Sequence, residues 1–298
     1  MKVSSQQIAA FTEVFRQRSV SDAASVLGIT QSAVTQHLAK LEQRVGSTLF
    51  IRYRTGLEPT KAAQELFLLT DRIDVLEKLV AEKVNAYSSL FDGNLSIIAN
   101  APRPAMPLIA RFKQNHPGVK VTFALLSWTK TMERLAARDV DIAIITEPDE
   151  IPGMFQQELT RNPFVAMLRC EHPLAAQQSV TMAELANEVM ILPEDGSLTQ
   201  RELTRASLAS GIRFANAIQM TTYAVMKEAV LHGLGVGIFL EDSVFPSREF
   251  VFRPVRELEK TFGTYVVTTK DKTDLKLVRA FLDECDDSVR AMVPDLQK

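Results

Sequence analysis

The hydrophobic pattern over residues 21–54 predicts a helix, a tight turn at Gly28, a second helix and a short hairpin. Apolar side chains recur at helical spacing in the second helix and would bury one of its faces; they are Val34, Leu38 and Leu41. The Thr30 hydroxyl can cap the N-terminus of that helix, and Gly46 stands where helices often end in a left-handed residue. A helix-turn-helix is therefore expected here.

The opposite face of the second helix carries polar and basic side chains, which can reach base edges or phosphate oxygens of DNA. Arg52 and Arg54 alternate in the hairpin that follows, so they would project to the same side and suit phosphate or minor-groove contact. The predicted DNA-binding residues are Thr30, Gln31, Ser32, Thr35, Gln36, Lys40, Arg52 and Arg54. The pattern alone leaves open an ordinary helical hairpin with a polar outer face.

Residues 10–52 resemble the N-terminal domain of LysR-type transcriptional regulators. The landmarks are the pair Ala23–Ala24, the run TQSAV that opens the second helix, Leu41–Glu42, and VGSTLFIR before the hairpin. The chain departs from the family pattern at Ser32, where Pro is common, and at Ala63, where Gly is common; neither change removes a DNA-contacting group. Chain length and domain order also resemble the family, which implies a sequence-specific DNA-binding regulator controlled by a small-molecule effector.

A second hydrophobic pattern, with spacings alternating between three and four, runs along a predicted helix from about residue 60 to residue 90. Its positions are Leu66, Leu69, Ile73, Leu76, Val80, Lys83, Tyr87 and Leu90. Such a seam is typical of a coiled coil between two copies of a chain, although a helix packed on its own domain stays open. In the resembled family this segment is the linker helix that pairs two DNA-binding domains.

From residue 94 onward, strand patterns alternate with helix patterns, which predicts an α/β domain with a mostly parallel sheet and helices on both faces. Strands are expected at residues 95–99, 119–126, 140–146, 164–169, 189–192, 218–220, 238–240 and 265–269. Helices are expected at 105–114, 129–138, 183–187, 200–210, 223–232 and 274–286. Two crossovers, near Asn162 and Gly263, would divide the domain into two lobes. The effector domain of the resembled family has this two-lobed form, like a periplasmic solute-binding protein.

The predicted fold is thus α/β overall, with an all-α winged helix-turn-helix, a long linker helix and a two-lobed effector domain. The expected domains are residues 1–60 for DNA binding, 61–90 for dimerisation and 91–298 for effector binding, the last with lobe I at 91–162 and 264–298 and lobe II at 163–263.

The cleft between the lobes is the expected effector site, because ligands gather at the carboxyl ends of parallel strands. The candidate effector-binding residues are Asn100, Ala101, Arg103, Ser127, Trp128, Thr146, Ser197, Thr199 and Tyr223. Arg103 is either an anion clamp or a surface arginine, and Trp128 either roofs the pocket or packs between the lobes. Ser127, Ser197, Thr199 and Thr222 stand at helix starts, where hydroxyls also serve as caps, and Thr199 with Glu202 forms the pattern of a capping box.

Charge is divided unevenly along the chain. The net charge is −2, but residues 1–60 hold seven Lys or Arg and four acids, so this part carries +3 and the remainder −5. Basic charge is therefore concentrated where the DNA-binding residues are expected. The modest excess favours a dimer, which doubles the phosphate contacts.

Composition argues against several other classes. No apolar run is long enough to cross a bilayer and the first residues are unlike a secretory signal, so a cytoplasmic protein without membrane contact is expected. Two distant cysteines, Cys170 and Cys285, predict reduced thiols rather than a redox pair. The four histidines lack metal-ligand spacing and no G-x-S-x-G elbow is present, so neither an enzyme nor a resident cofactor is expected.

The expected function is a homodimeric or homotetrameric transcriptional regulator that binds double-stranded promoter DNA, RNA polymerase and a small-molecule effector. A DNA-binding architectural protein or repressor without an effector, and a cytosolic small-molecule-binding protein, are the alternatives. Residues 194–212 and 226–239 resemble the LysR-type subgroup associated with aminoethylphosphonate catabolism, which implies an anionic metabolite as effector. A carboxylate, an amino acid and an aromatic acid stay open as effectors.

Overall fold

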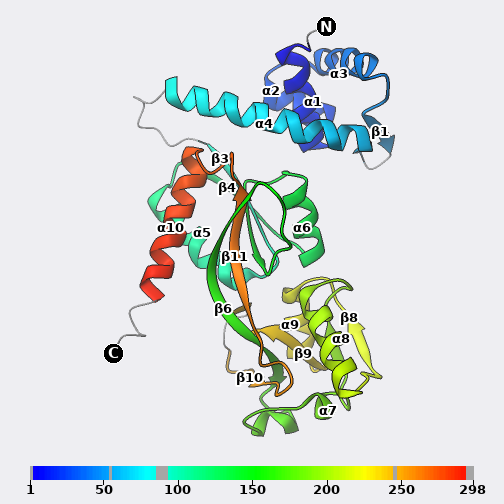
Figure 1. Cartoon of the computed structure of the whole chain (residues 1–298), viewed down its shortest axis with the longest axis vertical. Coiled ribbons are helices and arrows are strands. Elements are labelled where there is room, and N and C mark those ends of the chain that lie inside the picture. Colours follow the sequence, from blue (N-terminus) through cyan, green and yellow to red (C-terminus); the bar gives the residue numbers. More distant parts are fainter. Residues whose placement is uncertain (1–2, 54–55, 85–92, 244–246, 293–298) are drawn as a thin grey trace. The chain divides into compact units, whose positions relative to one another are not determined.

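The computed structural model describes residues 3–53, 56–84, 93–243 and 247–292. These residues form two compact units (Figure 1). The N-terminal unit contains the elements from α1 to α4, and the C-terminal unit contains those from β3 to α10.

The N-terminal unit is a three-helix core followed by a hairpin and a long helix. Its elements are α1 (Ser5–Gln17), α2 (Val20–Leu27), α3 (Gln31–Val45), β1 (Phe50–Tyr53), β2 (Gly56–Pro59) and α4 (Lys61–Val84). The core gathers buried side chains of all four helices, and the rings of Phe15 in α1 and Phe67 in α4 stack with centroids 3.9 Å apart. The first turns of α4 are thereby packed on the helix-turn-helix.

The predicted helix-turn-helix is confirmed in its details. Val34, Leu38 and Leu41 are buried on one face of α3. The Thr30 hydroxyl accepts a hydrogen bond from the Ala33 N–H at 3.2 Å and so caps the helix. Gly28 ends α2 with a φ of 65° and Gly46 ends α3 with a φ of 78°; only glycine adopts this left-handed backbone at no steric cost.

The far part of α4 exposes the predicted apolar seam. Leu69, Ile73, Leu76 and Val80 are between 37% and 63% exposed, whereas Ala63 and Phe67 near the start of the helix are buried in the core. The helix is described to Val84; Tyr87, Leu90 and the side chain of Lys83 lie outside the described residues. No described residue of the N-terminal unit therefore buries these four side chains of the seam.

The C-terminal unit is built on a nine-stranded mixed sheet in the order β4-β3-β5-β11-β6-β9-β7-β8, with β10 also paired to β6. The strands are β3 (Asn94–Ala99), β4 (Lys120–Leu125), β5 (Ile142–Thr146), β6 (Met154–Arg169), β7 (Met190–Leu192), β8 (Ala217–Gln219), β9 (Val236–Leu240), β10 (Phe250–Pro254) and β11 (Thr261–Thr269). Strands β3, β4 and β5 are mutually parallel, as are β7, β8 and β9, whereas β6, β10 and β11 pair antiparallel.

The expectation of a mostly parallel sheet is wrong for the centre of the unit. The crossovers expected near Asn162 and Gly263 lie inside β6 and β11, which pair with each other and run through both lobes (Figure 1). Strand β6 pairs with β11 as far as Pro163 and with β9 and β10 from Phe164 onward. The first half of β6 alternates exposed polar with half-buried residues, so its sequence lacked the apolar run that signals a buried strand.

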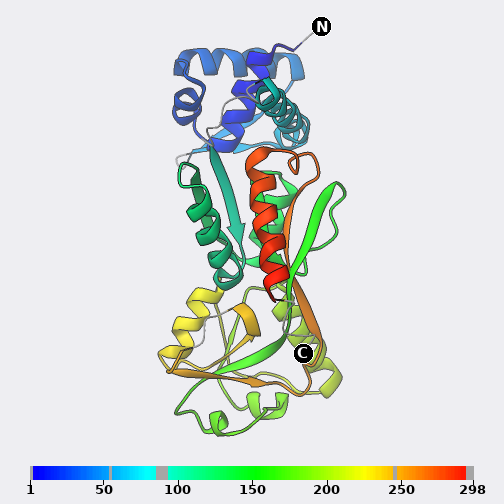
Figure 2. The same cartoon turned by 90° about the vertical axis from the view of Figure 1, so that its left-hand side faces the viewer.

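Helices cover both faces of each lobe. They are α5 (Pro102–Asn115), α6 (Trp128–Ala136), α7 (Met182–Leu185), α8 (Leu198–Ser210), α9 (Tyr223–Leu231) and α10 (Lys276–Met292), with short 3-10 turns η1 (Pro173–Ala176) and η2 (Glu241–Ser243). In lobe I, α5 and α10 lie side by side (Figure 2), with Phe112 and Phe281 rings 5.5 Å apart, and α6 packs on the opposite face of the sheet. In lobe II, α8 and α9 pack against different core clusters.

Among the described residues, no helix is long and apolar enough to cross a membrane. Both cysteines are free: Cys170 is exposed, and Cys285 is buried in α10, where burial raises the pKa of its thiol to about 12. Within the same part of the chain, no group of three or more histidine, cysteine or acidic side chains is arranged to hold a metal ion.

Candidate functional site

The outer face of α3 is a continuous polar surface. All of its predicted contact residues are exposed; they are Gln31, Ser32, Thr35, Gln36 and Lys40. This face lies opposite the buried Val34, Leu38 and Leu41, because the helical repeat of 3.6 residues separates the two sets. The amphipathic pattern therefore uses the apolar side for folding and leaves the polar side free for contacts.

The polar side chains of α3 differ in whether they form hydrogen bonds within the protein. The Thr35 hydroxyl donates to the Gln31 carbonyl at 2.9 Å, and the Gln31 amide donates to the Ser21 hydroxyl of α2 at 3.2 Å. In contrast, Ser32, Gln36 and Lys40 form no hydrogen bond or ion pair with any described residue. Gln31 thus supports the turn between α2 and α3, whereas Gln36 is available for a base edge.

The hairpin β1–β2 is anchored to α3 and to the end of α1. Glu42 of α3 accepts a hydrogen bond from the Leu49 N–H at 2.7 Å, and the Leu57 N–H donates to the Arg18 carbonyl at 3.1 Å. Arg52 is exposed on β1, where it pairs in register with Leu57; Arg54 lies outside the described residues. One predicted basic contact is therefore held on a supported strand.

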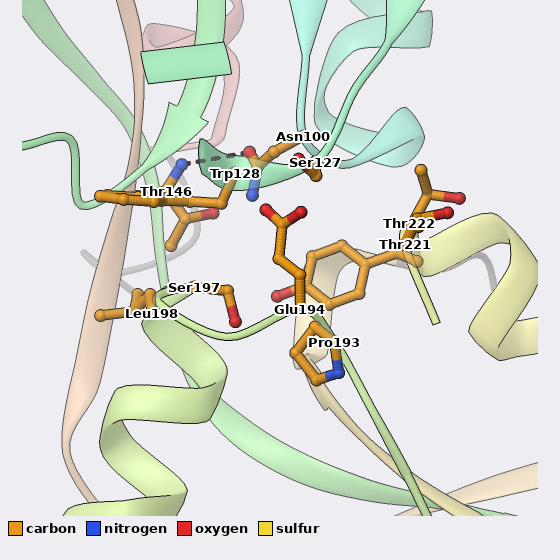
Figure 3. Close-up of a pocket in the computed structure, with 11 residues that line it drawn as sticks. Asn100, Ser127, Trp128, Thr146, Pro193, Glu194, Ser197, Leu198, Thr221 and Thr222 are labelled. Carbon is orange, nitrogen blue, oxygen red and sulfur yellow. Dashed lines mark hydrogen bonds between the residues drawn. The ribbon is translucent and has the colours of Figure 1, made fainter. Parts of the chain in front are cut away.

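A pocket lies between the two lobes of the C-terminal unit, with about 350 Å³ of empty space that is partly open to solvent (Figure 3). Its walls come from loops at the ends of β3, β5, β7 and β8 and from the first turns of α6, α8 and α9. The lining residues are Asn100, Ser127, Trp128, Thr146, Pro193, Glu194, Ser197, Leu198, Thr221, Thr222 and Tyr223. Polar groups from both lobes therefore converge on one concave site.

Six of the nine candidate effector residues line this pocket; they are Asn100, Ser127, Trp128, Thr146, Ser197 and Tyr223. Ala101, Arg103 and Thr199 do not. Arg103 donates instead to the Glu241 carbonyl in η2 at 3.2 Å. Because Arg103 is close to Asn100 in sequence, both were expected in one site. The first turn of α5 instead directs the Arg103 side chain to the Glu241 carbonyl.

The predicted capping box of Thr199 and Glu202 is wrong. Helix α8 begins two residues earlier than that pattern requires, and Ser197 caps it by accepting from the Gln200 N–H at 3.3 Å. Thr199 is buried within the first turn, and its hydroxyl lies 2.8 Å from that of Tyr223. Gly196, with a φ of 82°, turns the chain just before the cap, which shifts the helix start.

The other hydroxyls at helix starts act as caps. Ser127 accepts from the Lys130 N–H at 3.3 Å, and Thr222 accepts from the Val225 N–H at 3.5 Å. Capping uses one lone pair of each hydroxyl, so each retains a donor for the pocket. Capping and lining are therefore compatible roles.

The lobe I wall is held by an internal hydrogen-bond network. The Trp128 indole donates to the Thr146 carbonyl at 2.8 Å, and the Thr146 N–H donates to the Asn100 side-chain oxygen at 3.3 Å. The Arg201 guanidinium lies 4.6 Å above the indole ring. Trp128 therefore both packs in the lobe I core and borders the pocket.

Glu194 lines the pocket, although the candidate effector residues did not include it. Its carboxylate accepts a hydrogen bond from the Thr129 N–H at 3.0 Å, so a side chain of lobe II reaches the first turn of α6 in lobe I. It is the one acidic side chain among the lining residues. No local signal distinguishes it from Asp195, because the contact joins residues 65 positions apart.

Comparison with known proteins matches both units. The family model described as "LysR substrate binding domain" matches residues 91–290, and "Bacterial regulatory helix-turn-helix protein, lysR family" matches residues 5–64. The chain is similar to a RuBisCO operon transcriptional regulator of Allochromatium vinosum, with 28% identity over 240 residues and 80% of each chain covered.

Solved structures have the same fold. A full-length OxyR variant of Pseudomonas aeruginosa superposes with a TM-score of 0.77 at 15% identity, covering 97% of this chain and 95% of that one. CbnR, a LysR family regulator solved in complex with its target DNA, superposes with a TM-score of 0.58 at 17% identity, covering 97% and 100%. The chain therefore belongs to the LysR family of DNA-binding transcriptional regulators, with an N-terminal helix-turn-helix domain and a C-terminal effector-binding domain.

Proposed function

We propose that this protein binds paired promoter half-sites as a homodimer or a dimer of dimers, and that a small molecule in the interlobe pocket controls the binding. The observation that carries the proposal is the exposed polar face of α3 opposite its buried apolar face. Inserted in a major groove, this face presents Ser32, Gln36 and Lys40 to base edges and phosphates. The complex of CbnR with its target DNA supports this use of the fold.

The exposed seam of α4 is the proposed dimer contact. Apolar side chains at this spacing are stable in water only when a partner helix covers them, and a second copy supplies the same seam. Residues 1–60 then serve DNA binding, 61–90 dimerisation and 91–298 effector binding. Two-fold pairing also predicts an operator with two similar half-sites.

Control by the effector is proposed to be a shift between conformations. A ligand that contacts both walls of the pocket stabilises one arrangement of the lobes and so changes the spacing between the DNA-binding units. The protein is also proposed to contact RNA polymerase at the promoter and to act in the cytoplasm. The pocket is proposed to bind its ligand without a catalytic step.

The test is selection of binding sites from a randomised duplex library with the full-length protein, followed by gel retardation of the selected and random duplexes. The expected result is enrichment of an inverted repeat bound at least about a hundredfold more tightly than random duplex. Equal retardation of both duplexes at all salt concentrations would contradict sequence-specific regulation. Ligand-insensitive but specific retardation would instead indicate a repressor or architectural protein without an effector.

A further inference from the structure

The charge of the pocket is set by Glu194. Ten of the eleven lining residues are neutral, and their polar groups are hydroxyls, an amide and an indole N–H. Two cations lie near the pocket, and each has another partner: the Lys130 ammonium pairs with Glu133 at 2.6 Å and also interacts with the Glu194 charge, and the Arg201 guanidinium stacks on Trp128 and lies 3.7 Å from Asp149. The pocket therefore presents a carboxylate without a cationic side chain in its lining.

The two carboxylate oxygens of Glu194 have different surroundings. One accepts the hydrogen bond from the Thr129 N–H at the start of α6. The other accepts no hydrogen bond from any described residue. In Figure 3 the carboxylate rises from the lobe II wall into the space below Ser127 and Trp128. An acceptor that faces a cavity in this way requires a donor from water or from a ligand.

We propose that Glu194 makes the pocket select small molecules that carry an ammonium group, which pairs with the free carboxylate oxygen. A ligand that is purely anionic would bring a second negative charge beside Glu194, which is unfavourable in a partly desolvated site. The hydroxyls of Ser197, Thr221 and Thr222 line the same pocket on either side of Glu194 (Figure 3) and receive the polar end of the ligand.

The same pairing explains how a ligand bound at Glu194 affects both lobes. Glu194 belongs to lobe II, but its bonded oxygen contacts α6 of lobe I. An ammonium group on the free oxygen changes the charge that α6 receives at its N-terminus, where negative charge is favourable. This inference rests on the proposed effector role of the pocket and adds the chemical class of the effector.

The experiment uses the full-length protein and pairs of probes that share a skeleton with and without the ammonium group. The pairs are β-alanine and propionate, 4-aminobutyrate and butyrate, taurine and ethanesulfonate, and 2-aminoethylphosphonate and ethylphosphonate. Binding is followed by calorimetry and by the emission of Trp128, which is the only tryptophan of the chain and lines the pocket. The proteins are the wild type, Glu194→Gln and Glu194→Ala, with Asp195→Asn as the matched control, an exposed carboxylate next in sequence.

The expected result is that at least one ammonium-bearing probe binds the wild type about tenfold or more tightly than its partner. Glu194→Gln, which retains an acceptor for Thr129, is expected to lose that preference, whereas Asp195→Asn retains it. Equal binding of an anionic partner, an undiminished preference in Glu194→Gln, or no binding of any probe would overturn the inference. Operator retardation, measured in parallel, separates these outcomes from failure of the proposed regulator function.

Discussion

The hydroxyl oxygens of Thr199 and Tyr223 lie 2.8 Å apart and join the first turns of α8 and α9 beside the interlobe pocket. Tyr223 lines the pocket, whereas Thr199 lies behind it. Desolvation raises the pKa of Tyr223 to about 12, and the hydrogen bond with Thr199 offsets part of that rise. The phenol therefore stays neutral throughout the physiological range and holds the two helix starts together.

Tyr223→Phe is expected to lower the free energy of unfolding of the C-terminal unit by about 1 kcal/mol, because the Thr199 hydroxyl loses its partner. The difference from the wild type should be constant below pH 10 and disappear as the pH rises toward 12, since the raised pKa favours the neutral phenol in the folded state. Urea unfolding followed by Trp128 emission measures it. Tyr53→Phe, at an exposed position of the hairpin, is the control; an equal effect of both variants would contradict the prediction.

Gln36→Ala is expected to reduce discrimination between operator and random duplex by about 1–3 kcal/mol, because an unengaged amide on the outer face of α3 can form two hydrogen bonds with one adenine. Gln31→Ala and Thr35→Ala should also reduce discrimination, Gln31→Ala partly through the lost contact with Ser21. Competition binding measures the ratio. Gln64→Ala, at an exposed position of α4, should leave this affinity ratio unchanged. A reduced ratio in Gln64→Ala would show that the loss of discrimination comes from a disturbed fold and not from a lost base contact.

Arg52→Ala is expected to weaken binding to all duplexes alike and to reduce the slope of log affinity against log salt by about one for each lost phosphate contact. The measurement is a salt titration of the retardation of operator and random duplex. Arg213→Ala removes an exposed charge from the C-terminal unit and serves as the control. An unchanged slope for Arg52→Ala would show that Arg52 of the hairpin does not contact a DNA phosphate.

Asp74→Asn is expected to destabilise the attachment of α4 to α1, since Arg16 of α1 contacts Asp74 at 2.8 Å. Burial raises the pKa of Asp74, but the cations Arg16 and Lys78 outweigh it and hold this pKa below its ordinary value. A depressed pKa stabilises the fold above roughly pH 4, and this contribution is lost as the pH falls through the folded-state pKa.

Hydrogen exchange of the α1 amides measures the effect, which should reach about 1 kcal/mol at pH 7 and vanish in acid. Glu65→Gln, an exposed carboxylate on α4, is the control. If the stability difference between Asp74→Asn and the wild type does not change with pH, the Asp74 side chain stabilises the fold without its negative charge.

Leu76→Glu is expected to shift the proposed dimer toward monomer, because it places a charge in the middle of the exposed seam of α4. Sedimentation equilibrium measures the dissociation constant, and an increase of about a hundredfold or more is expected. Leu208→Glu, at a 79% exposed position of α8, is the matched control. An unchanged dimer in Leu76→Glu would place the contact on another surface.

Local patterns predicted α2, α3, the hairpin and the long helix α4 of the N-terminal unit. The apolar face of Val34, Leu38 and Leu41, the cap at Thr30 and the left-handed turn at Gly28 each depend on residues no more than seven positions apart. The pocket was predicted less fully. Residues at or directly after strand ends, such as Thr146 and Asn100, were identified because the carboxyl ends of parallel strands meet at one edge. The antiparallel strands β6 and β11 were predicted only in part. The first half of β6 alternates exposed and half-buried residues, and the first residues of β11, although mostly buried, are Thr, Phe, Gly and Thr and so form no apolar run.

The sequence by itself determined which helix faces are apolar and, for α3, where the helix begins and ends, because side-chain periodicity and capping act within a few residues. Only the tertiary structure decided which distant groups meet: Glu194 with Thr129, Thr199 with Tyr223, and Arg103 with the Glu241 carbonyl rather than with the pocket. These contacts depend on strand order and on the exact start of each helix. A shift of two residues at α8 moved Thr199 from a cap to a buried partner, since consecutive helical residues point about 100° apart.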